Sequence, residues 1–293
     1  MNYYNLENLE KTDLNGLMNN ENNYRKYVMK KFKNNSVINN STEGWLIPNK
    51  ILPVNRRENK NKLIISDIVK KKKVVVKISK KKELLEKDYN ISNILEELSC
   101  TNYIKYFGLF NCKDNINNYN IHKPLPKYFC KKNGTTNYFL FMEYYEMGSI
   151  VNYIPQNSND ITSIINQVLC ASILAYEKLG FIHGDLHPGN VLIKKTKKDK
   201  IIYKLDGVEK EIKTYGLEIK IFDFDRAEFT KNHNSFGKLL NQLMTFINLY
   251  DNYLLEKNIF NINNKILITP LRLLKKELFK VINIYSLKQI IGD

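Results

Sequence analysis

The apolar residues of this chain change their spacing along the sequence, and these changes limit the folds open to it. Short runs rich in β-branched residues, 62–68 and 73–79, predict neighbouring strands of a small antiparallel sheet. Over 82–98 the leucines and isoleucines recur at helical spacing, which predicts one long amphipathic helix. Residues 137–149 then predict a buried strand that runs into a short linker. The first part of the chain is therefore strand-rich with one main helix.

Beyond the linker the pattern becomes mostly helical. Residues 159–180 predict a helix with Asn159 or Asp160 as its N-cap and Gly180 as its C-cap. The rest of the chain, 236–293, also reads as helices. Between these regions the sequence predicts a strand at 191–193, a hairpin over 201–212 with Asp206-Gly207 as its turn, and a strand at 217–225 that ends in acids. We expect an α+β protein of two lobes, which suits a chain of 293 residues.

Charge and cysteine content narrow the class of protein less sharply. The formal net charge of +16 fits either a nucleic-acid or other polyanionic partner, or solvated lysine-rich faces. The charge is spread along the chain, which favours solvated faces. Four cysteines without a C-x-x-C pair give no support to a zinc finger or a redox motif, so we expect isolated thiols. No run approaches the roughly 18 apolar residues of a membrane span, and the first residues resemble no signal or transit peptide, so we expect an intracellular protein.

The segment HGDLHPGN, residues 183–190, carries the first chemical signal. Protein kinases use an aspartate in a loop to accept the proton of the substrate hydroxyl, and an asparagine five residues later to bind magnesium. Asp185 and Asn190 have this spacing. A further aspartate at the end of a strand is needed to hold magnesium, and Asp223 in the D-F-D of 223–225 stands there. This order of residues predicts a kinase-like catalytic loop and metal site.

The strand-rich half contains the matching residues for a nucleotide. Lys77 ends a V-V-V-K run and fits the lysine that contacts the α- and β-phosphates, with Asp88 or Glu86 as its carboxylate partner. The strand FLFMEY leads into a linker where the backbone groups of Glu143 and Tyr145 would bind adenine. The segment is therefore expected to bind ATP with Mg²⁺.

The predicted glycine loop is incomplete. Asn39-x-Ser41-x-x-Gly44 has the spacing of a phosphate-binding loop, but Gly44 is the only glycine in it. Glycines let the backbone approach phosphates closely. Either nucleotide affinity is reduced, or this segment is an ordinary polar turn.

Two other kinds of site fit less well. His183 and His187 are four residues apart, but Pro188 and Gly189 disfavour a helix there, and no H-E-x-x-H is present. A P-loop is excluded because the sequence holds no G-x-x-x-x-G-K.

The stretch from His183 to Asp225 resembles the haspin family of atypical eukaryotic protein kinases. The shared features are D-L-H-x-G-N-V-L-x-K-K-T, a hairpin of the Y-x-L-x-G type, and a G-L-x-x-x-I-x-D strand. The resemblance implies a bilobal protein-kinase-like fold and a Ser/Thr protein kinase that uses ATP and Mg²⁺, with the histone tail as substrate class and a nuclear location. It also makes Asp88 the partner of Lys77, and His183 a residue that braces the loop. Gly184 replaces the arginine that clasps an activation-loop phosphate, which implies activity without that phosphate.

Under this resemblance residues 1–35 are an N-terminal extension, 36–142 the N-lobe, 143–147 the hinge and 148–293 the C-lobe. We expect a monomer without membrane contact, acting on a protein. The segment after Asp225 lacks the acidic residues with which haspins hold a basic tail, and a charge of +16 would repel such a tail. The histone substrate is therefore less firmly predicted than the kinase.

Two alternatives remain. A small-molecule phosphotransferase of the aminoglycoside or choline type also has an H-G-D-L-H-P-G-N loop and an acid pair, although the hairpin favours haspin. A pseudokinase scaffold that binds nucleic acid or chromatin would fit the charge and the incomplete glycine loop. The presence of Lys77, Asp185, Asn190 and Asp223 argues against a scaffold, because a scaffold has no chemical need for all four.

Overall fold

The computed structural model describes residues 46–52, 61–68, 72–98, 102–114, 134–230, 235–257 and 269–278. The predicted extension 1–35 and the segment with Gly44 lie outside these ranges. The chain divides into two compact units, one formed by 1–93 and 105–144 and the other by 94–104 and 145–293. The sequence had assigned all of 36–142 to one lobe, whereas this division gives residues 94–104 to the second unit.

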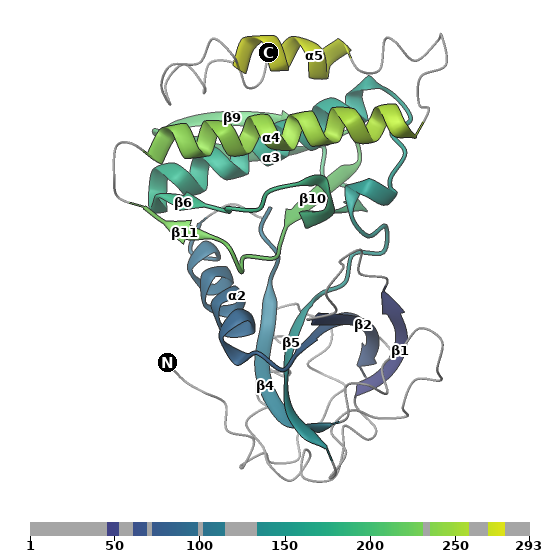
Figure 1. Cartoon of the computed structure of the whole chain (residues 1–293). Coiled ribbons are helices and arrows are strands. Elements are labelled where there is room, and N and C mark those ends of the chain that lie inside the picture. Colours follow the sequence, from purple (N-terminus) through teal and green to yellow (C-terminus); the bar gives the residue numbers. More distant parts are fainter. Residues whose placement is uncertain are drawn as a thin grey trace. The chain divides into compact units, whose positions relative to one another are not determined.

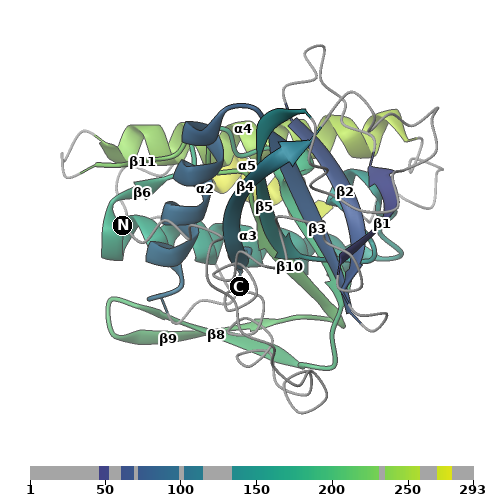
Figure 2. The same ribbon diagram turned by 90° about the horizontal axis from the view of Figure 1, so that it is seen from below.

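The first unit holds a five-stranded antiparallel sheet in the order β1-β2-β3-β5-β4 (Figure 1). The strands are β1 (Leu46–Leu52), β2 (Asn61–Ile68), β3 (Lys72–Ser79), β4 (Tyr106–Asp114) and β5 (Thr135–Glu143). Helix α2 (Lys82–Leu95) follows β3 and lies beside β4 in both views (Figures 1 and 2). Strand β3 is paired on both sides at the centre of the sheet, and its β-branched residues are buried on both faces.

The two predicted strands 62–68 and 73–79 are confirmed as β2 and β3, and the helix of 82–98 is confirmed but ends at Leu95. Strand β4 was not assigned from the sequence. Its pairing with β5 shifts register between Tyr106 and Gly108, so its apolar residues do not keep a strict period of two.

Helix α3 (Ser158–Leu179) forms the centre of the second unit, and most of its residues are buried. The predicted N-caps, Asn159 and Asp160, are wrong. Asn157 caps the helix, since its side chain accepts a hydrogen bond from the Asp160 N–H at 3.1 Å. The Asp160 carboxylate instead accepts from the Tyr153 hydroxyl at 2.6 Å, so it ties the preceding turn to the helix.

Two other helices and a hairpin pack on α3. They are α4 (Phe236–Glu256), α5 (Thr269–Leu278) and the hairpin of β8 (Lys200–Leu205) and β9 (Val208–Lys213). Figure 2 shows α3 between α4 and the hairpin. The hairpin is confirmed with its predicted turn, and its buried face consists of alternate residues of β8 together with Ile212 of β9. Among the residues that the structure describes, no helix is long and apolar enough to span a membrane.

The remaining elements of the second unit are short. They are β6 (Phe181–Ile182), β7 (Val191–Lys195), β10 (Leu217–Ile221), β11 (Glu228–Phe229), and the 3-10 turns η3 (Ile150–Asn152) and η4 (Pro188–Asn190). β10 pairs with β7, and β11 pairs with β6. All five residues of β10 are buried, so the sequence from 217 onwards enters the core of the unit before it reaches Asp223.

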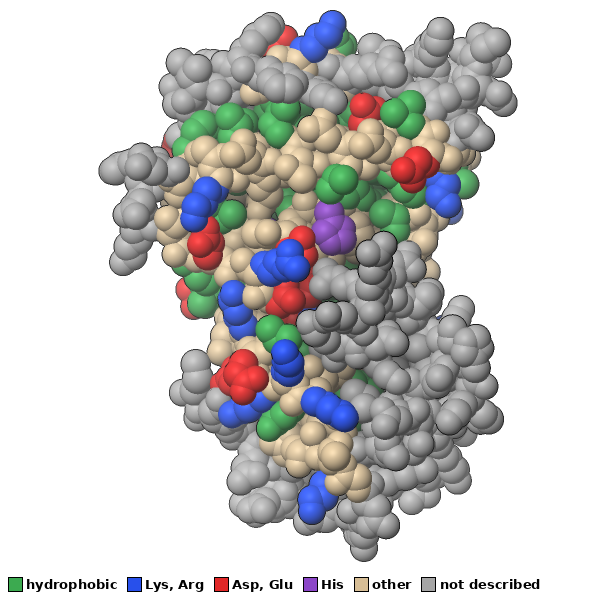
Figure 3. Space-filling view, viewed as in Figure 1, with side chains coloured by type: hydrophobic (Ala, Val, Ile, Leu, Met, Phe, Trp, Pro, Cys, Tyr) green, Lys and Arg blue, Asp and Glu red, His purple; other side chains and the backbone are tan. Residues whose placement is uncertain are grey.

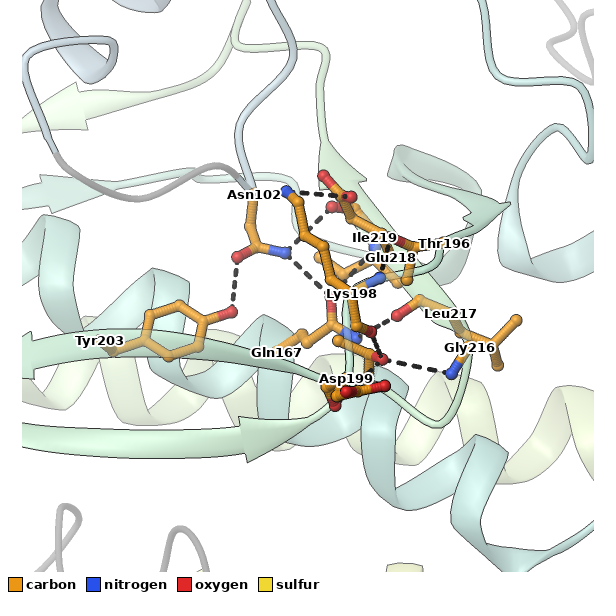
Figure 4. A network of polar contacts seen from close by, with 11 residues as sticks. Asn102, Gln167, Thr196, Lys198, Asp199, Tyr203, Gly216, Leu217, Glu218 and Ile219 are labelled. Carbon is orange, nitrogen blue, oxygen red and sulfur yellow. Dashed lines mark hydrogen bonds and ion pairs between the residues drawn. The ribbon is translucent and has the colours of Figure 1, made fainter.

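A buried polar network fixes the position of β10 (Figure 4). The Gln167 side chain on α3 accepts from the Ile219 N–H at 3.1 Å and donates to the Leu217 carbonyl at 2.9 Å. Asn102 donates to Gln167 Oε1 and to the Ile219 carbonyl, and Tyr203 of β8 donates to Asn102. Because buried polar groups must be paired, this network permits only one register of β10 against α3.

Two glycines with similar backbone angles differ in how closely they are packed. Gly180 ends α3 at φ +65°, as predicted, and a Cβ there would lie 1.9 Å from the Thr230 carbonyl oxygen. Gly207 has φ +78° in the hairpin turn, and a Cβ there would meet nothing within 4 Å.

We therefore expect Gly180→Ala to destabilise the protein more than Gly207→Ala. The hairpin variant carries only the cost of a left-handed alanine, about 1 kcal/mol. The Gly180 variant must also displace backbone, so we expect a total loss of about 3 kcal/mol or more in the free energy of unfolding. Urea titration of both variants measures the difference. Equal losses would show that the contact between Gly180 and Thr230 does not constrain the fold.

Candidate active site

The predicted nucleotide-binding lysine lies in the first unit, on the central strand β3. Its Nζ is 2.6 Å from the Oδ2 of Asp88 on α2, and the two side chains are 6% and 0% exposed. Glu86, the other predicted partner, instead lies 4.0 Å from Lys82 Nζ at the start of the same helix. Residues 86 and 88 point to different sides of α2, so only one of them can reach β3.

Burial of this charge pair is costly for the fold. An ion pair held out of water gains little net stability compared with apolar side chains of the same size. A buried cation held by one carboxylate is, however, well suited to contact an anion that enters the site. The pair of Lys77 and Asp88 therefore has the chemistry of a phosphate contact.

The 183–190 loop lies in the second unit, directly after β6. His183 is buried, and its Nε2 lies 2.9 Å from the Phe222 carbonyl oxygen, to which it donates. Its Nδ1 accepts a long contact of 3.4 Å from the Asp185 N–H. Burial lowers the pKa of His183 below its ordinary value of 6.5, against smaller raising effects of the Phe222 carbonyl, Asp223 and Asp185 and a lowering effect of His187. The neutral ring therefore braces the loop.

Asn190 connects the loop to the segment after β10. Its Nδ2 donates to the Asp185 carbonyl at 3.0 Å, and its own carbonyl accepts from the Phe222 N–H at 3.1 Å. The backbone N–H of Asn190 donates to the His187 carbonyl at 2.8 Å, which closes η4. The loop and residue 222 are thus joined by hydrogen bonds on both sides of Phe222.

Asp223 follows Phe222 in a left-handed conformation, with φ +72°. Phe224 is fully buried, with its ring centroid 5.6 Å from that of His183. Asp223 itself is only partly buried. The buried phenylalanine anchors the turn that presents the Asp223 carboxylate next to the loop.

Asn190 and Asp223 fit a magnesium ion by their chemistry. The Asn190 amide uses its nitrogen to hold the Asp185 carbonyl, so its oxygen is the end that remains as a ligand. Carboxylate and amide oxygens are ligands for hard cations, and magnesium keeps several waters or phosphate oxygens besides one or two protein ligands. In the described part of the chain, no three His, Cys, Asp or Glu side chains are grouped so that they could hold a metal ion.

The predicted adenine-binding residues belong to different units. Glu143 is the last residue of β5, and its N–H donates to the Lys105 carbonyl at 3.2 Å. Tyr145 is the first residue of the second unit at this boundary, is buried, and has Lys194 Nζ 4.7 Å from its ring centroid. Gly44, predicted to cover the phosphates, lies outside the described residues.

Two residues beside the loop were not predicted from the sequence. Arg226 lies near Asp185, with a guanidinium nitrogen 3.6 Å from Oδ1. Gln242 on α4 accepts a hydrogen bond from the Gly184 N–H at 2.8 Å. The position of Arg226 directly after D-F-D was a signal that could have found it. Gln242 is one of several polar residues of α4, and nothing in the pattern distinguishes it.

The lowered pKa of His183 predicts a dependence of stability on pH. Because the unfolded state binds a proton near pH 6.5 and the folded state only at lower pH, stability is complete above 6.5 and falls as the pH decreases below it. Between pH 7 and pH 5 we expect the free energy of unfolding of His183→Gln, which keeps a neutral donor, to fall less than that of the unsubstituted chain.

Urea unfolding at the two pH values measures this difference. His187→Asn is the control, because asparagine can accept the hydrogen bond that His187 Nδ1 takes from the Gly189 N–H, and His183 stays in place. An equal loss in the His183→Gln variant and the unsubstituted chain would show that His183 does not titrate on unfolding.

Comparison with known proteins identifies the family. The protein kinase domain model matches residues 64–248. The serine/threonine-protein kinase haspin of Mus musculus is 42% identical over 70 residues, which are 24% of this chain and 9% of the mouse protein. The serine/threonine-protein kinase haspin homolog of Arabidopsis thaliana is 28% identical over 105 residues, or 36% of this chain and 16% of that protein.

A third relative is the uncharacterized protein ZK177.2 of Caenorhabditis elegans, 26% identical over 129 residues, which are 44% of this chain and 40% of that protein. The matched part of the chain spans less than half the length of each of these relatives. The family model, in contrast, covers well over half of the chain, and its range includes every predicted site residue except Gly44. The chain is similar to haspins and belongs to the protein kinase domain family.

Proposed function

We propose that this chain is an ATP-dependent protein kinase that phosphorylates serine or threonine. The observation that carries the proposal is the hydrogen-bonded frame around Phe222. The His183 ring donates to the Phe222 carbonyl, and the Asn190 carbonyl accepts from the Phe222 N–H. Asn190 also donates to the Asp185 carbonyl. The same set of hydrogen bonds therefore supports the proposed base, Asp185, and the proposed metal ligands, Asn190 and Asp223. Phosphoryl transfer needs such positioning more than it needs covalent chemistry.

In the proposed reaction the substrate hydroxyl donates a hydrogen bond to the Asp185 carboxylate. Its oxygen attacks the γ-phosphorus in line, the bond from that phosphorus to the β–γ bridging oxygen breaks, ADP leaves, and the hydroxyl proton passes to Asp185. Lys77, oriented by Asp88, contacts the α- and β-phosphate oxygens. Backbone groups of Glu143 and Tyr145 bind adenine.

Asn190 and Asp223 are the proposed ligands of Mg²⁺. When bound, the ion offsets the charge that builds up on the β- and γ-phosphate oxygens. The amide of Asn190 is already oriented by its hydrogen bond to the Asp185 carbonyl. Binding of the ion therefore costs little conformational entropy at this side chain. We include Gly44 as a phosphate contact on the sequence pattern alone.

The protein substrate is proposed only as a class. A histone tail and a nuclear location follow from the resemblance to haspins. A chain of charge +16 would oppose a basic tail unless acidic residues gather locally. On the face in view in Figure 3, Lys and Arg side chains stand singly and several lie next to Asp or Glu. This mixed pattern gives no separate support to nucleic acid or chromatin as a partner. We propose a monomer.

The direct test follows labelled γ-phosphate from ATP with Mg²⁺. Substrates are histone H3, casein and an aminoglycoside panel. We expect label on protein, and a fall of about a hundredfold or more in kcat for Asp185→Asn, since general bases contribute at least this much.

Asp206→Asn is the matched control. It makes the same chemical change at the exposed hairpin turn, where asparagine before glycine is favoured, so its activity should match the unsubstituted chain. Label only on the aminoglycosides would instead favour a small-molecule phosphotransferase. No transfer to any substrate, or full transfer by Asp185→Asn, would contradict the proposed function.

A further inference from the structure

Arg226 places a positive charge beside the proposed catalytic base. Its guanidinium nitrogen lies 3.6 Å from Asp185 Oδ1, and the arginine and aspartate side chains are 64% and 21% exposed. This distance is that of an ion pair rather than of a hydrogen bond. Arg226 comes from the segment after β10, so the contact joins the 183–190 loop to the segment that carries Asp223.

The backbone of Arg226 is held in place close to the loop. A turn closes where the Ala227 N–H donates to the Phe224 carbonyl at 3.0 Å, and both Phe224 and Ala227 are buried. The base of the arginine side chain is therefore fixed while its charged end remains in solvent. Such a side chain can hold a neighbouring charge without being buried itself.

Gly184 permits the close approach of Arg226. It has φ +75°, and a Cβ at this position would lie 2.3 Å from the Arg226 carbonyl oxygen. Position 184 therefore has no room for any side chain, and the cation next to Asp185 comes from residue 226. The Gly184 N–H is held from the other side by Gln242. Gly184, the residue before Asp185, is thus held between α4 and the Arg226 backbone.

We propose that Arg226 is a positioning residue for Asp185, supplying from within the chain the cation that orients the carboxylate. This inference rests on the proposed function and adds to it how the base is kept in place. The charge pair favours the side-chain rotamer in which Asp185 Oδ1 faces the guanidinium. Because the cation is part of the chain, this orientation requires no added phosphate.

Positioning is favoured over the binding of an acidic substrate residue. An exposed ion pair contributes at most about 1 kcal/mol to stability, so the contact has little value to the fold alone. Arg226 faces Asp185 itself, and an arginine that bound the substrate would have to leave this contact. Small errors in the direction of a base affect the rate of reaction strongly.

The test compares steady-state kinetics on casein or histone H3, whichever the unsubstituted chain phosphorylates faster. Arg226→Met keeps the length of the side chain and removes its charge, and Arg226→Lys keeps the charge. Lys238→Met is the control, since Lys238 is 62% exposed and pairs with Glu228 at 2.7 Å in the same unit.

We expect Arg226→Met to lower kcat about threefold to tenfold, with the KM values for ATP and for the protein unchanged. Arg226→Lys should recover most of the lost kcat, and Lys238→Met should match the unsubstituted chain. Thermal unfolding should be unchanged for all three variants.

Three outcomes would overturn the proposal. The kcat of Arg226→Met could equal that of the unsubstituted chain, the change could appear only in the KM for the protein, or Arg226→Lys could be as slow as Arg226→Met. The second outcome would mean that Arg226 binds the substrate. If the unsubstituted chain transfers no phosphate at all, the proposed function fails together with this inference, whereas an active chain indifferent to Arg226 contradicts the inference alone.

Discussion

The backbone of Phe222 is the point on which the second unit's site depends. A peptide that is withdrawn from water must find partners for both its N–H and its carbonyl, and Phe222 directly follows β10 and is partly buried. The His183 ring binds the Phe222 carbonyl, and the carbonyl of Asn190, the residue before β7, accepts a hydrogen bond from the Phe222 N–H. The loop that carries Asp185 is therefore joined to the segment that carries Asp223 by the need to pair backbone hydrogen-bonding groups, as in a β-sheet. Movement of either segment would leave buried polar groups unpaired, which costs about 1–3 kcal/mol for each group.

The polar network beneath β10 extends this constraint into the core. Gln167 and Asn102 bind the backbone of the strand from α3 and from the segment before β4, so β10 cannot slip by one residue without breaking several hydrogen bonds. In the first unit, the pair of Lys77 and Asp88 is the corresponding costly feature. Apolar residues at these two positions would serve a sheet and a helix equally well or better. Charges that the fold does not need are easiest to understand as groups kept for a ligand.

Much of this arrangement could be predicted because it follows from local sequence. Gly180 marks the end of α3 since only glycine adopts its conformation cheaply, and Asp206-Gly207 marks a hairpin for the same reason. Asp185, Asn190 and Asp223 were found by their order and spacing. The choice of Asp88 over Glu86 needed the resemblance to haspins, because the sequence alone does not give the rotation of α2 about its axis. Strand β4 was missed because its register shift disturbs the alternation of apolar residues. The contact of Arg226 with Asp185 depends on the close approach of two backbone segments at Gly184. The spacing of apolar residues in the sequence does not predict such a tertiary contact.

The assignment of Asp223 and Asn190 as the oxygen ligands of a nucleotide-bound magnesium ion is central to the proposed kinase, and calorimetric titration with ATP tests it most directly. Binding is measured with and without Mg²⁺ for the unsubstituted chain, for Asp223→Asn and for Asp225→Asn. Asparagine tolerates the left-handed backbone of residue 223, so the first variant changes the charge and leaves the turn in place. We expect Mg²⁺ to strengthen ATP binding in the unsubstituted chain and in Asp225→Asn, and to have little effect in Asp223→Asn. Binding that is indifferent to Mg²⁺ in the unsubstituted chain, or an undiminished effect of Mg²⁺ in Asp223→Asn, would contradict the assignment.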